Sequence, residues 1–149
     1  IANHSLSHNF NLLYPGRIPN QSQIISEVDQ TNANFQAILG KDFKTRIFRY
    51  PGSHMSWQGL EGTDQALAKQ DVQWIDWNTL CGDAEPLSVR PTTSESMMAY
   101  MDDSQKYFPE TTVKVVLMHD TAGKELTVQT LPQIIDYFKN QGYTFGVLE

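Results

Sequence analysis

Two histidines stand four residues apart in the first segment of the chain, "IANHSLSHNF". The imidazoles of His4 and His8 can share one metal ion. Zinc, however, takes four ligands, or three with one open position where chemistry occurs, so two histidines do not complete a site. Histidines at this spacing are also common among the ordinary polar residues of surfaces and loops. The pair therefore indicates metal chemistry only if other residues supply further ligands.

Further polar residues follow the apolar segments that we expect to form strands. These are Arg49 after "TRIF", Asp76 and Asp83 after "VQWI", and His119 and Asp120 after "VKVVLM". The carboxyl ends of parallel strands point to one rim, where functional residues collect, so a metal, an arginine, a carboxylate and a further histidine would meet there. Each residue alone has a plainer interpretation. Arg49 can lie along a sheet end, "RYPG" can be only a turn, and His119 with Asp120 can cap the next segment.

The hydrophobic pattern predicts helices that alternate with strands. We expect helices over 21–39, 63–69, 95–107 and 127–140, and strands over 45–50, 72–77, 113–118 and 143–148. Near-continuous apolar strands such as "VKVVLM" need a sheet that is covered on both faces, which is typical of parallel sheets with helical crossovers. The sequence therefore predicts an α/β fold.

The composition excludes several classes of protein. With 149 residues the chain is one domain or part of one. Its formal net charge of −6 and the lack of a Lys/Arg cluster argue against nucleic acid or an anionic membrane surface as a partner, so a neutral ligand fits better. No apolar run approaches the roughly 18 residues of a membrane span. The single cysteine, Cys81, excludes an internal disulfide.

Four segments in chain order, "HSLSH", "RYPGS", "DWNTLCGDA" and "VVLMHD", resemble the motifs of the polysaccharide deacetylases of the NodB homology group, carbohydrate esterase family four. The resemblance spans nearly the whole chain. The matching positions are His4 and His8 in the metal-binding H-[ST]-x-x-H, Arg49, Pro51 and Gly52 in the R-x-P segment, Asp83 in the fourth motif, and Leu117 and His119 in the terminal L-x-H.

The first motif of that family, T-F-D-D, is not found in this sequence. In the family it lies upstream of the histidine pair and carries one aspartate that binds the metal and one that acts as general base. We therefore expect residues 1–149 to be the C-terminal part of one polysaccharide deacetylase domain, with the missing N-terminal segment as a partner. The implied fold is a distorted parallel (β/α) barrel that is incomplete at its N-terminal side.

The resemblance implies a hydrolase that depends on a divalent metal, expected to be Zn²⁺, held by His4 and His8. Arg49 would keep the missing base ionised, and the backbone N–H of Gly52 would help to stabilise the oxyanion. His119 would protonate the leaving amine.

Other residues are expected to support this chemistry or to contact the substrate. Asp83 would orient the imidazole of His119, Leu117 would line the pocket for the acetyl methyl group, and Tyr50 and Trp57 would stack on sugar rings. The implied reaction removes N-acetyl groups from N-acetylglucosamine in peptidoglycan or a chitin-like glycan. Such an enzyme would be secreted or associated with the cell wall.

Two other functions stay open. A non-catalytic carbohydrate-binding relative would keep the fold and the histidine pair, and the absent base and the replacement of the family's Asp-Trp by Asp83-Ala84 favour it. Trp57, Trp74 or Trp77 could substitute for that tryptophan, or simply pack. An esterase that removes O-acetyl groups from xylan would use the same residues as the N-deacetylase.

Three more specific expectations follow from the sequence. Asp83, rather than Asp76, should be the partner of His119, because it follows Gly82 where the chain can turn back toward the rim. His54 should be a solvated loop residue or a substrate contact and not a metal ligand. The 149 residues by themselves should be inactive, because the metal would have two ligands and no carboxylate would take the proton.

Overall fold

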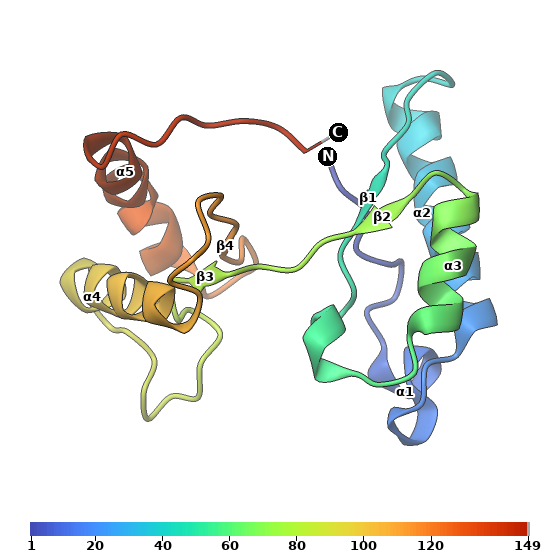
Figure 1. Ribbon diagram of the computed structural model, residues 1–149, viewed down its shortest axis with the longest axis horizontal. Helices are drawn as coiled ribbons and strands as arrows, with labels where there is room; N and C mark the ends of the chain where they lie inside the picture. Colours follow the sequence, from blue (N-terminus) through green and yellow to red (C-terminus); the bar gives the residue numbers. More distant parts are fainter. Residues whose placement is uncertain (149) are drawn as a thin grey trace. The chain divides into compact units, whose positions relative to one another are not determined.

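The computed structural model describes residues 1–148 (Figure 1). They form two compact units, one made of Ile1–Asp76 with Val147 and Leu148, and the other of Trp77–Gly146. Each unit has its own helices, a pair of parallel strands and an apolar core. The predicted α/β class is confirmed. Among the described residues, however, the strands form two separate two-stranded sheets, so the predicted barrel is not seen.

The longest helix of the first unit begins and ends at residues that suit helix termini. At the start of the longest helix, the side chain of Asn20 accepts a hydrogen bond from the N–H of Gln23 at 3.2 Å, and the helix ends at Gly40, which has a φ of 107°. The elements are α1 (Phe10–Leu13), the 3₁₀ turn η1 (Pro15–Arg17), α2 (Gln21–Leu39), β1 (Ile47–Phe48), the 3₁₀ turn η2 (His54–Ser56), α3 (Glu61–Lys69) and β2 (Gln73–Trp74).

The sheet of the first unit brings the N-terminal residues next to the segment that carries the arginine. Strand β1 pairs in parallel with β2, with Ile47 opposite Gln73. Asn3 forms a further parallel bridge with Phe48: its N–H donates to the carbonyl of Ile47 and its carbonyl accepts from the N–H of Arg49, both at 2.9 Å. The residues that follow Asn3 and those that follow β1 therefore leave the sheet in the same direction.

Helices α2 and α3 lie side by side next to this sheet (Figure 1). Their apolar faces close the core, because residues at helical spacing on each helix point to the same side. The buried residues of this core are Leu13, Tyr14, Ile24, Val28, Phe48, Tyr50, Leu60, Leu67 and Val72.

The second unit is built around helices α4 and α5, which lie side by side. Helix α4 begins with a capping box in which Thr93 and Ser96 exchange hydrogen bonds. The elements are β3 (Thr79–Leu80), α4 (Ser94–Ser104), the 3₁₀ turn η3 (Gln105–Tyr107), β4 (Val116–Leu117) and α5 (Glu125–Asn140). Strand β3 is parallel to β4. The buried core residues are Cys81, Met97, Met101, Ile134 and Phe138.

The four predicted helices are confirmed, and the helix over 21–39 has the predicted bounds. The strands are shorter than predicted, because in each of them only two residues pair with the neighbouring strand. Over 143–148 the structure has no strand, although Phe145 and Val147 suit one; both are exposed. The predicted strand over 72–77 ends at Trp74, and the separate strand β3 was not predicted. Among the described helices, none has both the length and the apolar character that a membrane span requires.

Candidate active site

His4 lies beside Arg49, which contacts both nitrogens of its ring. The Nδ1–H of His4 donates to the backbone carbonyl of Arg49 at 2.6 Å, and Nη2 of the Arg49 guanidinium donates to Nε2 of His4 at 2.8 Å. A carbonyl only accepts and a guanidinium only donates, so His4 is the neutral tautomer with its lone pair on Nε2. Histidine binds metals in this form, with the other ring nitrogen oriented by a hydrogen bond.

His8 is exposed and lies next to His4. The two rings meet edge to face with their centroids 5.0 Å apart. Two imidazoles on one tetrahedral zinc ion have ring centres roughly 5 Å apart, given Zn–N bonds of about 2.0–2.1 Å. The spacing therefore fits a shared ion. Within residues 1–148, no group of three His, Cys, Asp or Glu side chains is placed to hold a metal. The pair offers two ligands, and a complete site needs at least one more.

The carboxylate of Glu27 holds the loop between the two histidines. It accepts hydrogen bonds from the N–H groups of Leu6 at 3.1 Å and Ser7 at 2.9 Å, and from the Ser7 hydroxyl at 2.7 Å. Glu27 is 2% exposed. Burial by itself would raise its pKa, but the hydrogen bonds from Ser7, Gln23 and Leu6 outweigh burial and lower the pKa overall. The loop is therefore anchored by a buried, ionised carboxylate.

The sequence analysis missed this anchor and its companion, Asn3. The side chain of Asn3 is buried, donates to the carbonyl of Val28 at 3.0 Å and accepts from the N–H of Ser5 at 3.0 Å. A signal for Glu27 was present: it lies between Ile24 and Val28 on the face of α2 that the apolar spacing assigns to the core. A charged residue at such a position is rarely buried without a partner.

The turn after Arg49 favours a residue without a side chain at position 52. Gly52 has a φ of 79°, and a Cβ there would lie 3.1 Å from Cζ2 of Trp57 and 3.2 Å from Cζ of Phe10. The indole N–H of Trp57 donates to the carbonyl of Pro51 at 2.9 Å and closes this turn. The match of Gly52 to the family motif thus has a local steric reason, and the role of its N–H in catalysis stays a prediction.

Tyr50 does not present a ring face to a sugar. It is fully buried, and its hydroxyl donates to Oδ1 of Asp64 at 2.8 Å. Burial, followed by this hydrogen bond to Asp64, raises the pKa of Tyr50. The expected stacking at Tyr50 is therefore wrong, because the residue packs in the core of its unit. Trp57 is half-buried: it stacks on Tyr14 at a centroid distance of 3.9 Å, and the guanidinium of Arg17 lies 5.1 Å from its ring centroid.

His54 is half-buried and held in place, and not simply a solvated loop residue. Its Nε2 contacts Oδ2 of Asp64 at 2.9 Å, and its ring stacks on Trp74 at a centroid distance of 3.8 Å. Asp76 accepts hydrogen bonds from the N–H groups of His54 and Met55, both at 3.0 Å. These hydrogen bonds of the Asp76 carboxylate tie the segment that follows β2 to the turn η2. That His54 binds no metal stays a prediction.

In the second unit, Asp83 contacts His119 through both of its carboxylate oxygens. Oδ1 accepts from Nδ1–H of His119 at 2.8 Å, and Oδ2 accepts from the backbone N–H of His119 at 2.8 Å. Asp83 is buried and the side chain of His119 is 30% exposed. The predicted pairing of His119 with Asp83, and not with Asp76, is confirmed as a contact. A buried carboxylate that orients a partly exposed imidazole is suited to proton transfer.

Two residues at the start of α5 support Asp83 and were not predicted. The hydroxyl of Thr127, which is buried, donates to Oδ2 of Asp83 at 3.1 Å, and the ammonium group of Lys124 donates to the backbone carbonyl of Asp83. Burial by itself would raise the pKa of Asp83, but the hydrogen bonds and charge of His119 and the hydroxyl of Thr127 lower it overall. No sequence motif marks Thr127, because it approaches Asp83 from 44 residues away.

The loop before Asp83 is tightly packed. Gly82 has a φ of 78°, and a Cβ there would lie 2.8 Å from Tyr100 and 3.0 Å from Pro91. Cys81 is fully buried in the core, where it packs as a small apolar residue, and burial raises the pKa of its thiol to about 11. Leu117 is half-buried in β4, and its carbonyl accepts from the N–H of Cys81 at 3.4 Å.

The predicted residues thus form two groups. The first unit brings together His4, His8 and Arg49, with Gly52 in the turn that follows, and the second brings together Asp83 and His119, with Leu117 in the strand before His119. That both groups meet at one rim stays a prediction.

Comparison with known proteins relates the chain to carbohydrate esterases. No family model matches the sequence. A solved Streptococcus mutans CE4 esterase is 53% identical, with a TM-score of 0.97, over 99% of this chain and 62% of that chain. The catalytic domain of a peptidoglycan N-acetylglucosamine deacetylase from Eubacterium rectale is 26% identical, with a TM-score of 0.75, over 99% of this chain and 64% of that chain.

A sequence relative adds a second type of polysaccharide enzyme. A bifunctional xylanase/deacetylase from Pseudobutyrivibrio xylanivorans is 28% identical over 126 residues, which are 85% of this chain and 18% of that protein. The chain therefore spans less than two thirds of each of these three proteins.

Proposed function

We propose that this chain, whose motifs and fold resemble those of the polysaccharide deacetylases of carbohydrate esterase family four, is part of a metal-dependent hydrolase that removes N-acetyl groups from N-acetylglucosamine residues of peptidoglycan or a chitin-like glycan. The observation that carries the proposal is the contact of Asp83 with His119, at 2.8 Å between Oδ1 and Nδ1. This contact fixes which ring nitrogen faces outward, as a general acid requires.

His119 protonates the leaving amine in this proposal. With Nδ1–H bound to Asp83, the proton that is transferred is carried by Nε2, on the side of the ring away from the carboxylate. The ionised Asp83 stabilises the imidazolium that forms before the transfer. Thr127 and the backbone N–H of His119 keep Asp83 in one orientation. Leu117 lines the space for the acetyl methyl group.

His4 and His8 hold the divalent metal, for which Zn²⁺ is the proposed ion. Their ring spacing suits a shared ion, and Nε2 of His4, which accepts here from the Arg49 guanidinium, becomes a metal ligand when that guanidinium turns to an acidic side chain. A bound zinc ion would supply a Lewis acid that activates water and polarises the acetyl carbonyl. The guanidinium of Arg49, which lies at the same ring nitrogen, is placed to orient an acidic side chain next to the two histidines.

The remaining ligand and the general base come from the family's Asp-Asp motif, in a segment of a longer protein that includes this chain. The length of the solved relatives supports this, since the chain spans 62% of one and 64% of the other. The same segment would add strands to the sheets and complete the barrel. Trp57 and the backbone N–H of Gly52 line the substrate side, and the enzyme acts at the cell wall or after secretion.

The test is acetate release from N-acetylglucosamine hexamer, with zinc supplied, by the longer protein and by residues 1–149 alone. We expect activity only in the longer protein, because a positioned general acid or base typically contributes about 10²–10⁴-fold in rate. In the longer protein, His119→Ala should abolish most turnover and leave the zinc content unchanged. Equal activity of the two proteins would contradict the role of the upstream segment.

An O-acetyl xylan esterase is the second candidate, favoured by the similarity to the bifunctional xylanase/deacetylase. Acetylated xylan in the same assay separates the two, because the preferred substrate should have the higher kcat/KM. Release of acetate from neither substrate, with the fold intact and zinc bound, would favour a non-catalytic carbohydrate-binding protein.

A further inference from the structure

A pocket of about 500 Å³ lies in the first unit, between the turn η2 and the start of α3. Its size is in the range of about 300–1,000 Å³ that is usual for ligand sites. The residues that line it and could contact a ligand are His54, Trp57, Gln58, Glu61 and Asp64. None of them belongs to the residues assigned above to metal binding or proton transfer.

The wall of this pocket is fixed in place by hydrogen bonds. Oδ1 of Asp64 accepts from the hydroxyl of Tyr50 at 2.8 Å, and Oδ2 contacts Nε2 of His54 at 2.9 Å. Because the carboxylate oxygens accept these bonds, the imidazole carries its proton on Nε2, and neutral His54 has an acceptor at Nδ1. The His54 ring is in turn clamped by stacking on Trp74. Asp64 and His54 are thus arranged before a ligand binds.

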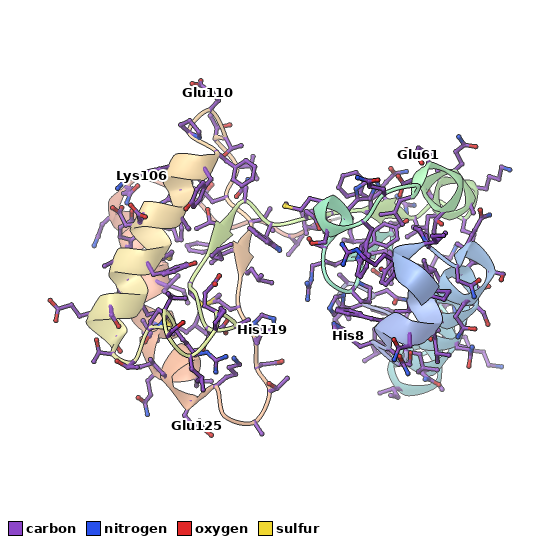
Figure 2. The ribbon with its side chains drawn as sticks, turned by 90° about the horizontal axis from the view of Figure 1, so that it is seen from below. His8, Glu61, Lys106, Glu110, His119 and Glu125 are labelled. Carbon is purple, nitrogen blue, oxygen red and sulfur yellow. The ribbon has the colours of Figure 1, made fainter. Side chains whose placement is uncertain are left out.

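The mouth of the pocket is polar and acidic. Gln58 and Glu61 are exposed, and Glu61 lies at the outer surface of its unit (Figure 2). Together with Asp64 they offer two carboxylates and an amide, which accept from and donate to hydroxyl groups. Two carboxylates disfavour an anionic ligand, because like charges repel.

A row of aromatic rings connects this pocket with the histidine pair. The ring of Phe10 lies 5.3 Å from that of His8 and 5.5 Å from that of Trp57, between centroids. Phe10 is 43% exposed. His8 and Glu61 lie apart in Figure 2, so a ligand that reaches both must be extended. The exposed ring of Phe10, followed by hydroxyl-binding groups in the pocket, suits a chain of sugar rings, whose C–H faces are apolar and whose edges carry hydroxyls.

We propose that this pocket is a distal subsite for a neutral glycan, which holds a sugar residue of the polymer some distance from the acetyl group that reacts. The proposal rests on the proposed function and deepens it, since it predicts a preference for long, uncharged glycan chains. Asp64, Glu61, Gln58 and His54 bind the hydroxyls of this sugar, and Phe10 guides the chain between the pocket and the metal pair.

The first experiment compares two substrates of the longer protein: N-acetylglucosamine hexamer, and 4-nitrophenyl acetate, which is too small to reach the pocket. Glu61→Gln and Gln58→Ala should each lower the ratio of kcat/KM for the hexamer to kcat/KM for the ester by roughly 5-fold, the effect of losing one hydrogen bond of about 1 kcal/mol. Asp42→Asn is the matched control, because Asp42 is exposed in the same unit and does not line the pocket. Its ratio should equal that of the unaltered protein.

The second experiment measures binding without turnover. Titration with N-acetylglucosamine hexamer should shift the ring signals of His54 and Trp57 in an NMR spectrum, and Glu61→Gln should weaken the binding. A hexamer of galacturonic acid, which is anionic, should cause a much smaller shift at the same concentration. If no acetate is released from any substrate, the proposed function fails, whereas the subsite is still decided by this titration. Unchanged His54 and Trp57 signals, or equal kcat/KM ratios in all variants, would overturn the subsite.

Discussion

The two groups of candidate residues differ in how firmly the described residues hold them. In the second unit, Asp83 is 4% exposed and its carboxylate accepts three hydrogen bonds, so the orientation of His119 is set before any ligand binds. In the first unit, His4 is half-buried, His8 is exposed, and the loop that carries them depends on Glu27. The proposed general acid is prearranged, whereas the proposed metal pair requires ligands from elsewhere to be completed.

The strongest test of this contrast is Asp83→Asn, which replaces an acceptor that serves three donors by an amide with one acceptor oxygen. We expect turnover of the longer protein to fall by about 10²–10⁴-fold, with the zinc content unchanged. Steady-state acetate release and metal analysis measure the two effects. Asp76→Asn is the control and should affect turnover far less; the opposite order of the two variants would contradict the assignment of Asp83.

A second test adds one methyl group to the loop that carries Asp83. Gly82→Ala would place Cβ at 2.8 Å from Tyr100 in a backbone conformation that L-residues rarely adopt, and should lower the free energy of unfolding by roughly 3 kcal/mol. Gly123→Ala is a matched control, because Gly123 has a similar φ of 82° with nothing within 4 Å of the new Cβ. It should cost only about 1–2 kcal/mol. Urea unfolding measures both, and equal losses would show that the close contact is relieved.

The third test loosens the histidine loop. Glu27→Gln removes a carboxylate that accepts from Leu6 and Ser7, so we expect the zinc affinity to fall by about 10–100-fold, as for other residues that orient metal ligands. Isothermal titration with zinc gives the affinity. Asp42→Asn should leave it unchanged. An unaltered affinity in Glu27→Gln would mean that the loop keeps its shape without the buried anchor.

A smaller effect is expected at Thr127, whose hydroxyl donates to Asp83. Thr127→Val should reduce turnover about 10-fold, the rate equivalent of one lost hydrogen bond of about 1.4 kcal/mol, and Thr127→Ser should restore it. Because loss of a donor raises the pKa of Asp83, the acid limb of the pH–rate profile should move to higher pH in Thr127→Val. A lower rate with an unmoved acid limb would indicate that Thr127 acts only through packing.

The smallest expected effect is that of acid on the free energy of unfolding. The pKa of Glu27 and that of Asp83 are lowered below their ordinary values of 4.5 and 3.8, so their contribution to stability is complete above those values and is lost as the pH falls through the folded-state pKa. The free energy of unfolding should therefore decline below about pH 4.5. Urea unfolding from pH 6 to pH 2.5 measures this decline, which should be shallower in Asp83→Asn and in Glu27→Gln.

Local patterns in the sequence were enough to predict the helices, to locate the four motifs and to prefer Asp83 as the partner of His119. The helix over 21–39 follows from apolar spacing and from Gly40, and the preference for Asp83 over Asp76 follows from the turn that Gly82 permits. The helices, the motifs and the turn at Gly82 each depend on residues within a few positions of one another, so a single sequence carries them. The motif resemblance likewise needed only the order of short segments.

The tertiary structure alone decided which polar residues are buried, where strands pair and what supports the site. Tyr50 lies in the core and not on a sugar face, Glu27 anchors a loop 20 residues away, and Thr127 reaches Asp83 across 44 residues. Residues 143–148 have the composition of a strand but no ladder of hydrogen bonds. Strand pairing and the burial of a polar group depend on partners from distant parts of the chain, because an extended segment or a carboxylate is stable there only when those partners satisfy its hydrogen bonds.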